Sequence, residues 1–272
     1  MLITKLDSAV SDNSLLKIGE HRVTITKIPS PGTGMQHSFR AVNDLGATTH
    51  IRTTDGEFFN DPEHTTSLGD SVDRISPMSM LYFSDTTKDV IFDNKYNITD
   101  FVWNIRTADL GDGKDLLWNV ANLTNWETYS ALVEMETSDF SSATGLTKIN
   151  CYSPKFTGNV SQLPTTLASL AINDSGITGT YAELATLVNL TRAEVKNTAL
   201  AGDLADLAPL VNATVLLLQG TTLTGTSTPQ DLADAMFAAG RTSGTLSLVL
   251  PNSISWTLTF TTSGGTATQN PI

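Results

Sequence analysis

The sequence is poor in cysteine, in aromatic residues and in charge. Of its 272 residues one is cysteine, 7% are aromatic and 16% are charged. The single thiol, Cys151, excludes an internal disulfide framework and a zinc site built from several cysteines. No window approaches the roughly 18 apolar residues of a transmembrane helix, and residues 1–16 lack the continuous apolar core of a secretion signal. We therefore expect a protein that is made in a cytoplasm and has no membrane partner.

Basic residues are also scarce. The chain has 16 lysines and arginines against 28 acids, which gives a formal net charge of -12. The excess of acid is spread along the chain, so no basic arm is present. An acidic surface repels the phosphate backbone of nucleic acids and anionic membranes. We expect neither of them as a partner.

What the second half does contain is an internal repeat of about 23 residues. Residues 167–189 align without gaps on residues 190–212 and then on residues 213–225. The aligned columns are Leu170, Ala193 and Leu216; Ile172, Val195 and Leu218; Ile177, Leu200 and Leu223; and Gly179, Gly202 and Gly225. A unit 21 residues upstream has Leu146, Ile149, Cys151, Phe156, Gly158 and Leu163 in these positions, and Val133, Met135 and Phe140 indicate a degenerate earlier copy. This spacing is typical of a leucine-rich repeat.

Each column of the repeat has a physical reason. Alternating apolar residues place two side chains on one face of a short parallel strand, and the glycine lets the chain turn back across the coil. One unit cannot bury its own leucines, so units must stack into a solenoid. Ser175, Thr198 and Thr221 stand where such repeats usually have asparagine. We interpret Cys151, which occupies a strand position of the repeat, as a buried core residue and not as a nucleophile.

The whole pattern predicts a β-rich α+β chain, with a small N-terminal β module followed by a short leucine-rich-repeat solenoid of period 21–23. We assign residues 1–85 to a small β-rich module of a kind that docks on a partner, and residues 86–272 to the repeat domain. Within the repeat domain we expect an N-terminal cap at about 86–130, coils at about 131–226 and a C-terminal cap at about 227–265. The N-terminal strand candidates are residues 17–28, 38–42, 49–53 and 80–84.

The C-terminal cap is expected to be a helix followed by a β-hairpin. Ser227 or Thr228 is the N-cap candidate, and Pro229 lies in the first turn. The residues that share the apolar face of this helix are Leu232, Met236 and Phe237. Alternating runs at 245–250 and 255–260 predict the hairpin, with Trp256 covering the last coil. We expect residues 263–272 to be a loose tail.

Outward-facing strand positions form the surface through which solenoids of this kind bind. The candidate interaction face consists of Lys148, Asn150, Tyr152, Asn173, Arg192, Glu194, Lys196, Val215, Leu217 and Gln219. Its last row is unexpectedly apolar. We therefore expect the C-terminal hairpin or a neighbouring subunit to cover Val215 and Leu217.

Signals of catalysis are weak. The four histidines, His21, His37, His50 and His64, have no partners at metal-ligand spacing. The loop at residues 109–115 contains three aspartates but lacks the alternating acids and final glutamate of an EF-hand loop. Glu134 and Glu136 share one face of a strand, with no opposing acid that can be placed across from them. We predict no enzyme, no metal site and no cofactor.

The turns ITG, LAG and LTG at 177–179, 200–202 and 223–225, together with the helix and the segment GRTSG at 240–244, resemble leucine-rich-repeat proteins encoded by tailed, crAss-like phages of gut Bacteroidetes. The match covers roughly residues 87–265. This resemblance implies a virion surface protein of the head-fibre or capsid-decoration type, synthesised in the host cytoplasm and displayed on the particle.

The resemblance also implies partners. The first are other virion proteins, namely the capsid or a decoration protein, with residues 1–85 as the particle-attachment module. The second are further copies of the chain, which form a trimer by analogy with fibres. The third is a glycan or another ligand on the host surface. Similar repeats occur in bacterial surface proteins. The alternative is therefore a bacterial leucine-rich-repeat adhesin or a protein- or glycan-binding module.

Overall fold

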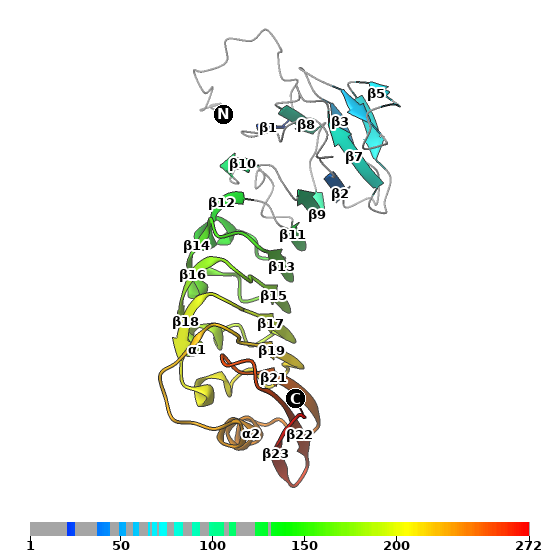
Figure 1. Ribbon diagram of the computed structural model, residues 1–272. Helices are drawn as coiled ribbons and strands as arrows, with labels where there is room; N and C mark the ends of the chain where they lie inside the picture. The colour runs from blue at the N-terminus through cyan, green and yellow to red at the C-terminus, as the bar shows by residue number, and fades with distance from the viewer. Residues whose placement is uncertain are drawn as a thin grey trace, which may run out of the picture.

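The repeats form a solenoid. The computed structural model describes residues 123–129 and 132–271, residues 57 and 65, and the strands that lie between residues 21 and 112. Figure 1 shows the coils stacked one below another, each giving one strand to each of two sheets on opposite sides of the stack. This arrangement confirms the leucine-rich-repeat type of fold that the spacing predicts.

Among the described residues, thirteen strands form one continuous sheet, the long sheet. In spatial order they are β23 (Gly264–Gln269), β22 (Ser255–Thr261), β21 (Gly244–Val249), β19 (Val215–Leu217), β17 (Arg192–Glu194), β15 (Ser169–Ala171), β13 (Lys148–Cys151), β11 (Asn125–Tyr129), β9 (Ile98–Ile105), β2 (His37–Asn43), β7 (Ser79–Phe83), β4 (Phe58–Phe59) and β5 (Ser67–Gly69). The strands from β9 to β21 are parallel, and the strands beyond them at both ends are antiparallel.

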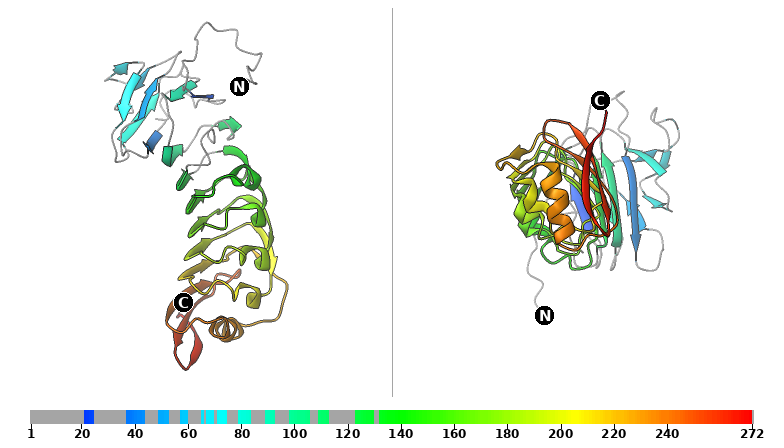
Figure 2. Two further views of the ribbon diagram at one scale, coloured as in Figure 1. Left: turned by 180° about the vertical axis from the view of Figure 1, so that it is seen from behind. Right: turned by 90° about the horizontal axis from the view of Figure 1, so that it is seen from below.

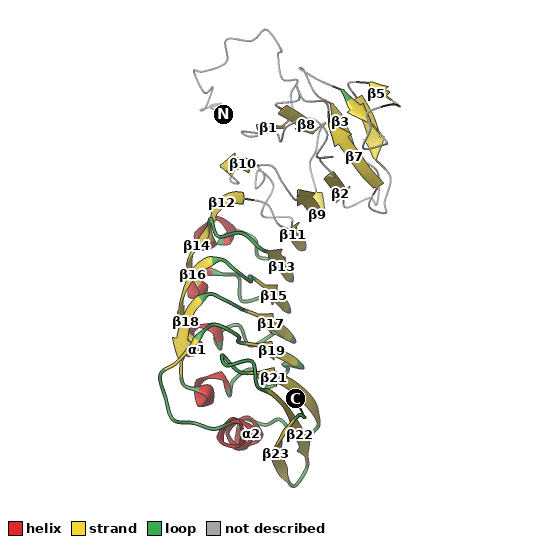
Figure 3. Ribbon diagram, in the orientation of Figure 1, coloured by secondary structure: helices red, strands yellow, loops and turns green. Residues whose placement is uncertain are grey.

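The second sheet runs along the other side of the coils. Its parallel strands are β10 (Asp109–Asp112), β12 (Leu132–Glu136), β14 (Phe156–Asn159), β16 (Gly176–Thr180), β18 (Ala199–Gly202) and β20 (Thr222–Leu223). Short helical turns follow these strands, as Figure 3 shows. They are η3 (Thr137–Phe140), η4 (Val160–Gln162), α1 (Tyr181–Leu184) and η5 (Leu204–Leu207).

The core lies between the two sheets and is built from the predicted columns. Pairing along the long sheet stacks Trp126, Ile149, Leu170, Ala193, Leu216 and Leu248 in one inward row, and all six are fully buried. Cys151, Ile172, Val195 and Leu218 form the next row and are equally buried. The structural role predicted for Cys151 is therefore confirmed. Burying a large apolar side chain contributes about 1.5–3 kcal/mol, so these rows hold the stack together.

Side-chain caps begin each of the described helical turns. In all five the N3 side chain accepts a hydrogen bond from the N-cap backbone N–H. The side chains of Thr180 and Thr228 also accept from the N3 backbone N–H, which completes a capping box, and those of Asn159 and Asp203 accept from the N2 backbone N–H. The N-cap residues are Glu136, Asn159, Thr180, Asp203 and, for the C-terminal helix α2 (Pro229–Ala238), Thr228. Thr228 is thus the cap where the sequence left Ser227 as an alternative. Each coil fixes its own turn locally.

A left-handed residue lies in the turn after each of three successive long-sheet strands, β15, β17 and β19. Asp174, Asn197 and Gly220 have φ of 57°, 54° and 72° and lie one repeat apart. Aspartate, asparagine and glycine are the residues that tolerate this conformation best. The Asn197 side chain also donates to the Asp174 Oδ1 at 2.7 Å, which ties neighbouring turns together.

The glycine column has more than one physical basis. Gly158 and Gly179 have positive φ, as the sequence argument requires, whereas Gly202 does not. At Gly202 the constraint is space, because an added Cβ would lie 2.7 Å from the Cβ of Tyr181 in the preceding coil. The column therefore records close packing as well as backbone turning.

The column of hydroxyl residues Ser175, Thr198 and Thr221 forms hydrogen bonds mainly within the turns. Thr198 and Thr221 donate to the carbonyls of Val195 and Leu218, three residues earlier, at 2.8 and 2.6 Å. The Ser175 hydroxyl is buried and makes no hydrogen bond to a described residue. The Thr221 hydroxyl also forms a 2.6 Å hydrogen bond with the Tyr181 hydroxyl of the coil at residues 167–189, so this column bridges coils at Thr221.

The C-terminal cap is larger than predicted. Helix α2 forms where expected, but β22 pairs with β21 on one side and with a third strand, β23, on the other. The expectation of a loose tail at residues 263–272 is therefore wrong for β23. Figure 2 shows α2 and this strand together at the end of the stack. The Gln230 side chain joins them, because it donates to the Gly265 carbonyl at 3.0 Å and accepts from the Ala267 N–H at 2.9 Å.

The two sheets are capped unequally. Trp256 packs partly buried against the core beside Leu248, as predicted, and Arg241 donates to carbonyl oxygens of Ala213 and Thr245 beneath the cap. Leu223, however, is 39% exposed, although its column mates Ile177 and Leu200 are fully buried. No strand follows β20 in the second sheet as described, so Leu223 lacks the cover that the following coil gives to Ile177 and Leu200.

Four strands of the first 85 residues, His21–Thr24, His37–Asn43, Thr49–Arg52 and Ser79–Phe83, overlap the four predicted segments, whereas Phe58–Phe59, Ser67–Gly69 and Ser71–Arg74 were not predicted. Beside the long sheet lies a four-stranded sheet of β1 (His21–Thr24), β8 (Asp89–Phe92), β3 (Thr49–Arg52) and β6 (Ser71–Arg74). Strands β8 and β9 pair with strands from the first 85 residues. The division at residue 85 stays a prediction. None of the helices in the described ranges is long and apolar enough to cross a bilayer.

Candidate functional site

The structure places the ten predicted residues along one face of the long sheet, which we call the candidate face. The strand register puts Lys148, Arg192 and Val215 in one row, with Ser169 between them. The next row contains Asn150, Ala171, Glu194 and Leu217. Tyr152 directly follows its strand, and Asn173, Lys196 and Gln219 each lie two residues beyond theirs. Whether this face binds a partner stays a prediction.

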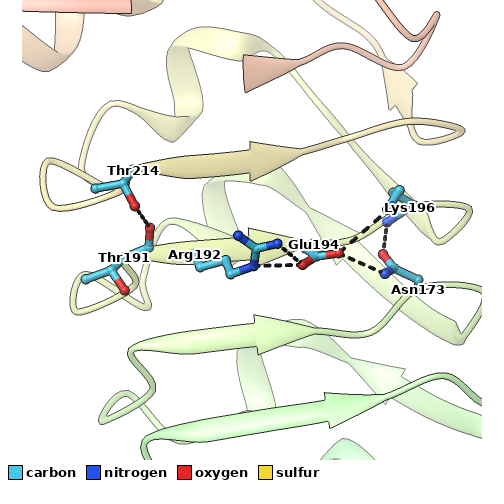
Figure 4. Close-up of polar contacts among 6 residues, drawn as sticks. All are labelled: Asn173, Thr191, Arg192, Glu194, Lys196 and Thr214. Carbon is cyan, nitrogen blue, oxygen red and sulfur yellow. Dashed lines mark hydrogen bonds and ion pairs between the residues drawn. The ribbon is translucent and has the colours of Figure 1, made fainter. Parts of the chain in front are cut away.

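Glu194 is the centre of the polar half of the face (Figure 4). Its Oε1 atom accepts a hydrogen bond from Arg192 Nε at 2.7 Å and forms an ion pair with a terminal nitrogen of the same guanidinium. Its Oε2 atom accepts from Asn173 Nδ2 at 3.2 Å and lies 3.9 Å from Lys196 Nζ. Asn173 Oδ1 in turn accepts from the Lys196 backbone N–H at 2.9 Å. Two cations and an amide therefore compensate one carboxylate.

Several residues of the candidate face are deeper than the sequence suggests. Asn173 is 4% exposed, and Asn150 and Glu194 are each 9% exposed. Alternation predicts the direction of a side chain but not how far its neighbours cover it. Arg192 and Lys196 of the same coil, and Asn173 of the preceding one, contact the Glu194 carboxylate. The expectation that the side chains of Asn150, Asn173 and Glu194 form open surface is therefore wrong. They support the residues that solvent reaches.

Tyr152 extends the cluster to the preceding coil. Burial raises the pKa of its phenol, and the nearby charge of Glu194 raises it further. A hydrogen bond with Asn173 and the positive charge of Arg192 oppose this shift. The phenol is thus electrostatically linked to the same group of side chains.

A second buried carboxylate, which the sequence analysis missed, lies at the other end of the face. Glu127 Oε1 accepts from Lys148 Nζ at 2.7 Å and from Asn125 Nδ2 at 2.9 Å. Strand β11 has no visible repeat pattern, but its pairing with β13 sets Glu127 beside Asn150. The arrangement resembles the Glu194 cluster, because in both a buried glutamate side chain pairs with a more exposed cation.

The apolar end of the face lies at β19 and β21. Val215 and Leu217 are half-buried, and the register sets them beside Ser247 and Val249 of β21. The C-terminal hairpin prolongs the long sheet at this point and does not fold over it. Cover by a neighbouring subunit stays a prediction.

A threonine ladder borders the face and was also missed. The hydroxyls of Thr147, Thr191 and Thr214 donate to the carbonyls of Thr124, Ala168 and Thr191 in the preceding coil, at 2.9, 2.9 and 3.0 Å. Figure 4 shows the Thr191–Thr214 step. The residues recur at the repeat spacing, which could have revealed the ladder. It ties the strand entrances of successive coils together and so holds the rows in register.

Groups that could support catalysis do not converge in the described residues. Burial raises the pKa of the Cys151 thiol to about 12, although a hydrogen bond with Thr128 lowers it slightly, so the thiol stays protonated and has no access to solvent. Glu134 and Glu136 are exposed on β12, where Glu134 pairs with Lys155 at 2.8 Å. No group of three potential metal ligands occurs within the described ranges. His64 and Asp115 lie outside those ranges.

A hollow of about 300 Å³ lies beside the turns that follow η3 and η4. Its lining carries no acid, base or thiol. The residues that line it are Ser141, Thr144, Gln162, Leu163, Pro164, Thr165 and Thr166. These groups can donate and accept hydrogen bonds, but they cannot exchange a proton near neutral pH.

Comparison with known proteins gives distant structural similarities alone. No protein family model and no curated protein matches the sequence. Similar solved structures include the plant peptide hormone receptor RGFR1 in complex with RGF2, at 17% identity over 45% of this chain and 20% of that chain, with a TM-score of 0.38. An internalin from Listeria monocytogenes has 18% identity over 49% and 37%, with a TM-score of 0.36. A leucine-rich-repeat protein of Leptospira interrogans has 11% identity over 48% and 32%, with a TM-score of 0.34. This chain spans between a fifth and two fifths of the length of those proteins.

Proposed function

We propose that this chain is a non-enzymatic leucine-rich-repeat binding protein of a phage particle, of the head-fibre or capsid-decoration type, which binds its partner through the candidate face. One observation carries the binding role. Ten side chains from four successive coils lie on one face of a sheet whose register is fixed by the buried rows and the threonine ladder. A preformed surface of this kind loses little conformational entropy on binding.

The particle part of the proposal rests on the resemblance of the repeat turns and of the C-terminal ending to phage virion proteins. In this arrangement the N-terminal strands attach to a capsid or decoration protein, and the coils are displayed. Further copies of the chain, and a ligand on the host surface, are proposed partners. An acidic chain suits a displayed surface protein, because net charge keeps it soluble.

Mass spectrometry of gradient-purified virions tests the particle part. The chain is expected among the stoichiometric structural proteins. Purified particles that contain every other structural protein but lack this chain would contradict its place on the virion.

Two variants with the same added charge test the face. Leu217→Arg places a cation in the apolar row, and Ser161→Arg places one on the exposed helical turn η4 on the other side of the coil. Adsorption of phage to host cells should fall at least about tenfold for Leu217→Arg, since one lost contact of 1.4 kcal/mol is a factor of ten. It should not change for Ser161→Arg. Equal adsorption by both variants would refute binding through the candidate face.

A further inference from the structure

The candidate face has the opposite charge character to the rest of the repeat domain. Residues 123–271 contain five basic and eleven acidic side chains. Three of the five basic residues, Lys148, Arg192 and Lys196, are on the candidate face. Most of the acids lie on the second sheet, its helical turns and α2, which are the sites of the side-chain caps.

Exposure sharpens this difference. The side chains of Lys148, Arg192 and Lys196 are 39%, 46% and 34% exposed. The side chains of the acids that pair with them, Glu127 and Glu194, are 9% and 12% exposed, counted without the backbone. A partner that approaches the face therefore meets cations first, while the compensating acids lie beneath.

The cations remain able to bind. Arg192 uses Nε and one terminal nitrogen for Glu194, and a guanidinium has further N–H donors that point elsewhere. Lys196 Nζ lies 3.9 Å from its carboxylate, which is beyond hydrogen-bond distance. The buried acids hold the cations in place, and a carboxylate from a partner can then complete their hydrogen bonding.

We infer, building on the proposed function, that the candidate face takes an extended polypeptide segment in which acidic residues are followed by aliphatic ones. The cations of the first and third coils select the acids, and Val215, Leu217 and Val249 select the aliphatic side chains. These three are half-buried aliphatic residues and provide no aromatic platform, so they suit peptide side chains better than sugar rings.

The strand spacing fixes the pattern of the segment. Neighbouring strands are about 4.8 Å apart, and an extended chain of the polyproline II type rises about 3.1 Å per residue with three residues per turn, so that every third side chain shares a face. Lys148 and Arg192 stand two strands apart, at about 10 Å, which matches acidic residues three positions apart. Leu217 lies one strand beyond Arg192 and Val249 two strands beyond it, which places an aliphatic residue three positions after the second acid.

A display library of random twelve-residue peptides, panned on the immobilised full chain, tests this inference. We expect enrichment of peptides with two acids three positions apart and an aliphatic residue three positions after the second acid. A synthetic copy of the most enriched peptide is then titrated against variants. Lys196→Gln and Arg192→Gln should each weaken its binding about tenfold, the usual effect of one charge-assisted contact, and added salt should weaken binding to the parent chain.

Lys155→Gln is the matched control. Lys155 has the same 34% side-chain exposure as Lys196 and also pairs with a glutamate, but that partner, Glu134, belongs to the second sheet. The control should bind the peptide like the parent chain. Equal weakening by Lys155→Gln, or enrichment of basic or uncharged peptides, would overturn the inference.

Two other outcomes would also overturn it. One is the absence of enrichment over the bare support. The other is binding of a probe polysaccharide, polysialic acid, that depends on Lys196 while no peptide binds. Neither result decides the proposed function, which fails separately if virions lack the chain or if Leu217→Arg leaves adsorption unchanged.

Discussion

Removal of one complete coil should shorten the solenoid without unfolding it. Deletion of residues 190–212 replaces each buried position by its column mate, so that Leu216 takes the place of Ala193 and Leu218 that of Val195. Because solenoid stability is close to a sum over repeats and their interfaces, the cost is roughly the share of one coil. At about 0.05–0.15 kcal/mol per residue this is about 1–3 kcal/mol. Loss of the hydrogen bond between Tyr181 and Thr221, 2.6 Å long in the structure, adds about 1 kcal/mol.

Deletion of residues 190–200 is the out-of-register comparison. It removes less of the chain, but it moves Asp206 into the position of Val195, which is fully buried. An unpaired carboxylate in such a place costs several kcal/mol, and the columns that follow are displaced as well. We therefore expect this smaller deletion to abolish the cooperative unfolding transition.

Urea unfolding followed by circular dichroism measures both effects. The in-register variant should keep a single transition with a reduced m-value, because m scales with the surface that unfolding exposes. If the two deletions destabilise the protein equally, the additive description of the coils is refuted.

Three further predictions concern single residues. Leu200→Ala should lower the free energy of unfolding by about 2–5 kcal/mol. Leu223→Ala should lower it by less than about 1 kcal/mol, because Leu223 is already 39% exposed. Equal losses of stability in urea unfolding would contradict the open edge of the second sheet. The folded-state pKa of Cys151 is raised from 9.0 to about 12, so above about pH 9 this thiol ionises only in the unfolded chain. The free energy of unfolding should therefore fall by up to about 1.4 kcal/mol per pH unit. A Cys151→Ala variant whose stability falls with the same slope between pH 9 and 11 would argue against burial of the thiol as the cause. Gln230→Ala removes the hydrogen-bond partner of two backbone groups on the edge strand β23. Sedimentation of this variant should therefore show more self-association at high protein concentration than sedimentation of the parent chain. Identical sedimentation would show that Gln230 does not protect this edge.

The sequence predicts the coils well because their physics is periodic. A side chain such as Leu170 or Leu216 is buried by its neighbours one repeat away, so the same residue type recurs at the same spacing. The left-handed turns also recur at this spacing, but Asp174, Asn197 and Gly220 share a tolerated φ and not a residue type. An alignment based on hydrophobicity does not detect these three positions.

The parts that escaped prediction depend on neighbours distant in sequence. Strand β23 lacks apolar alternation and forms because β22 and Gln230 supply its hydrogen-bond partners. In the candidate site, alternation predicted the direction of Glu194 but not its depth, which results from Arg192, Lys196 and Asn173 around it. Glu127 was missed because β11 joins the sheet without the repeat pattern.

The crosswise strands of the stack have a mechanical consequence. In Figure 1 the strands lie across the long axis of the solenoid, so the hydrogen bonds between parallel strands point along that axis. Tension along the axis would break the hydrogen bonds between strands of one coil at a time, and not those of all coils together. Each coil that opened would release about 75 Å of extended chain in place of about 5 Å of stack, from a rise of about 3.3 Å per residue. A chain held at one end and bound near the other would therefore yield stepwise under load and keep its partner attached.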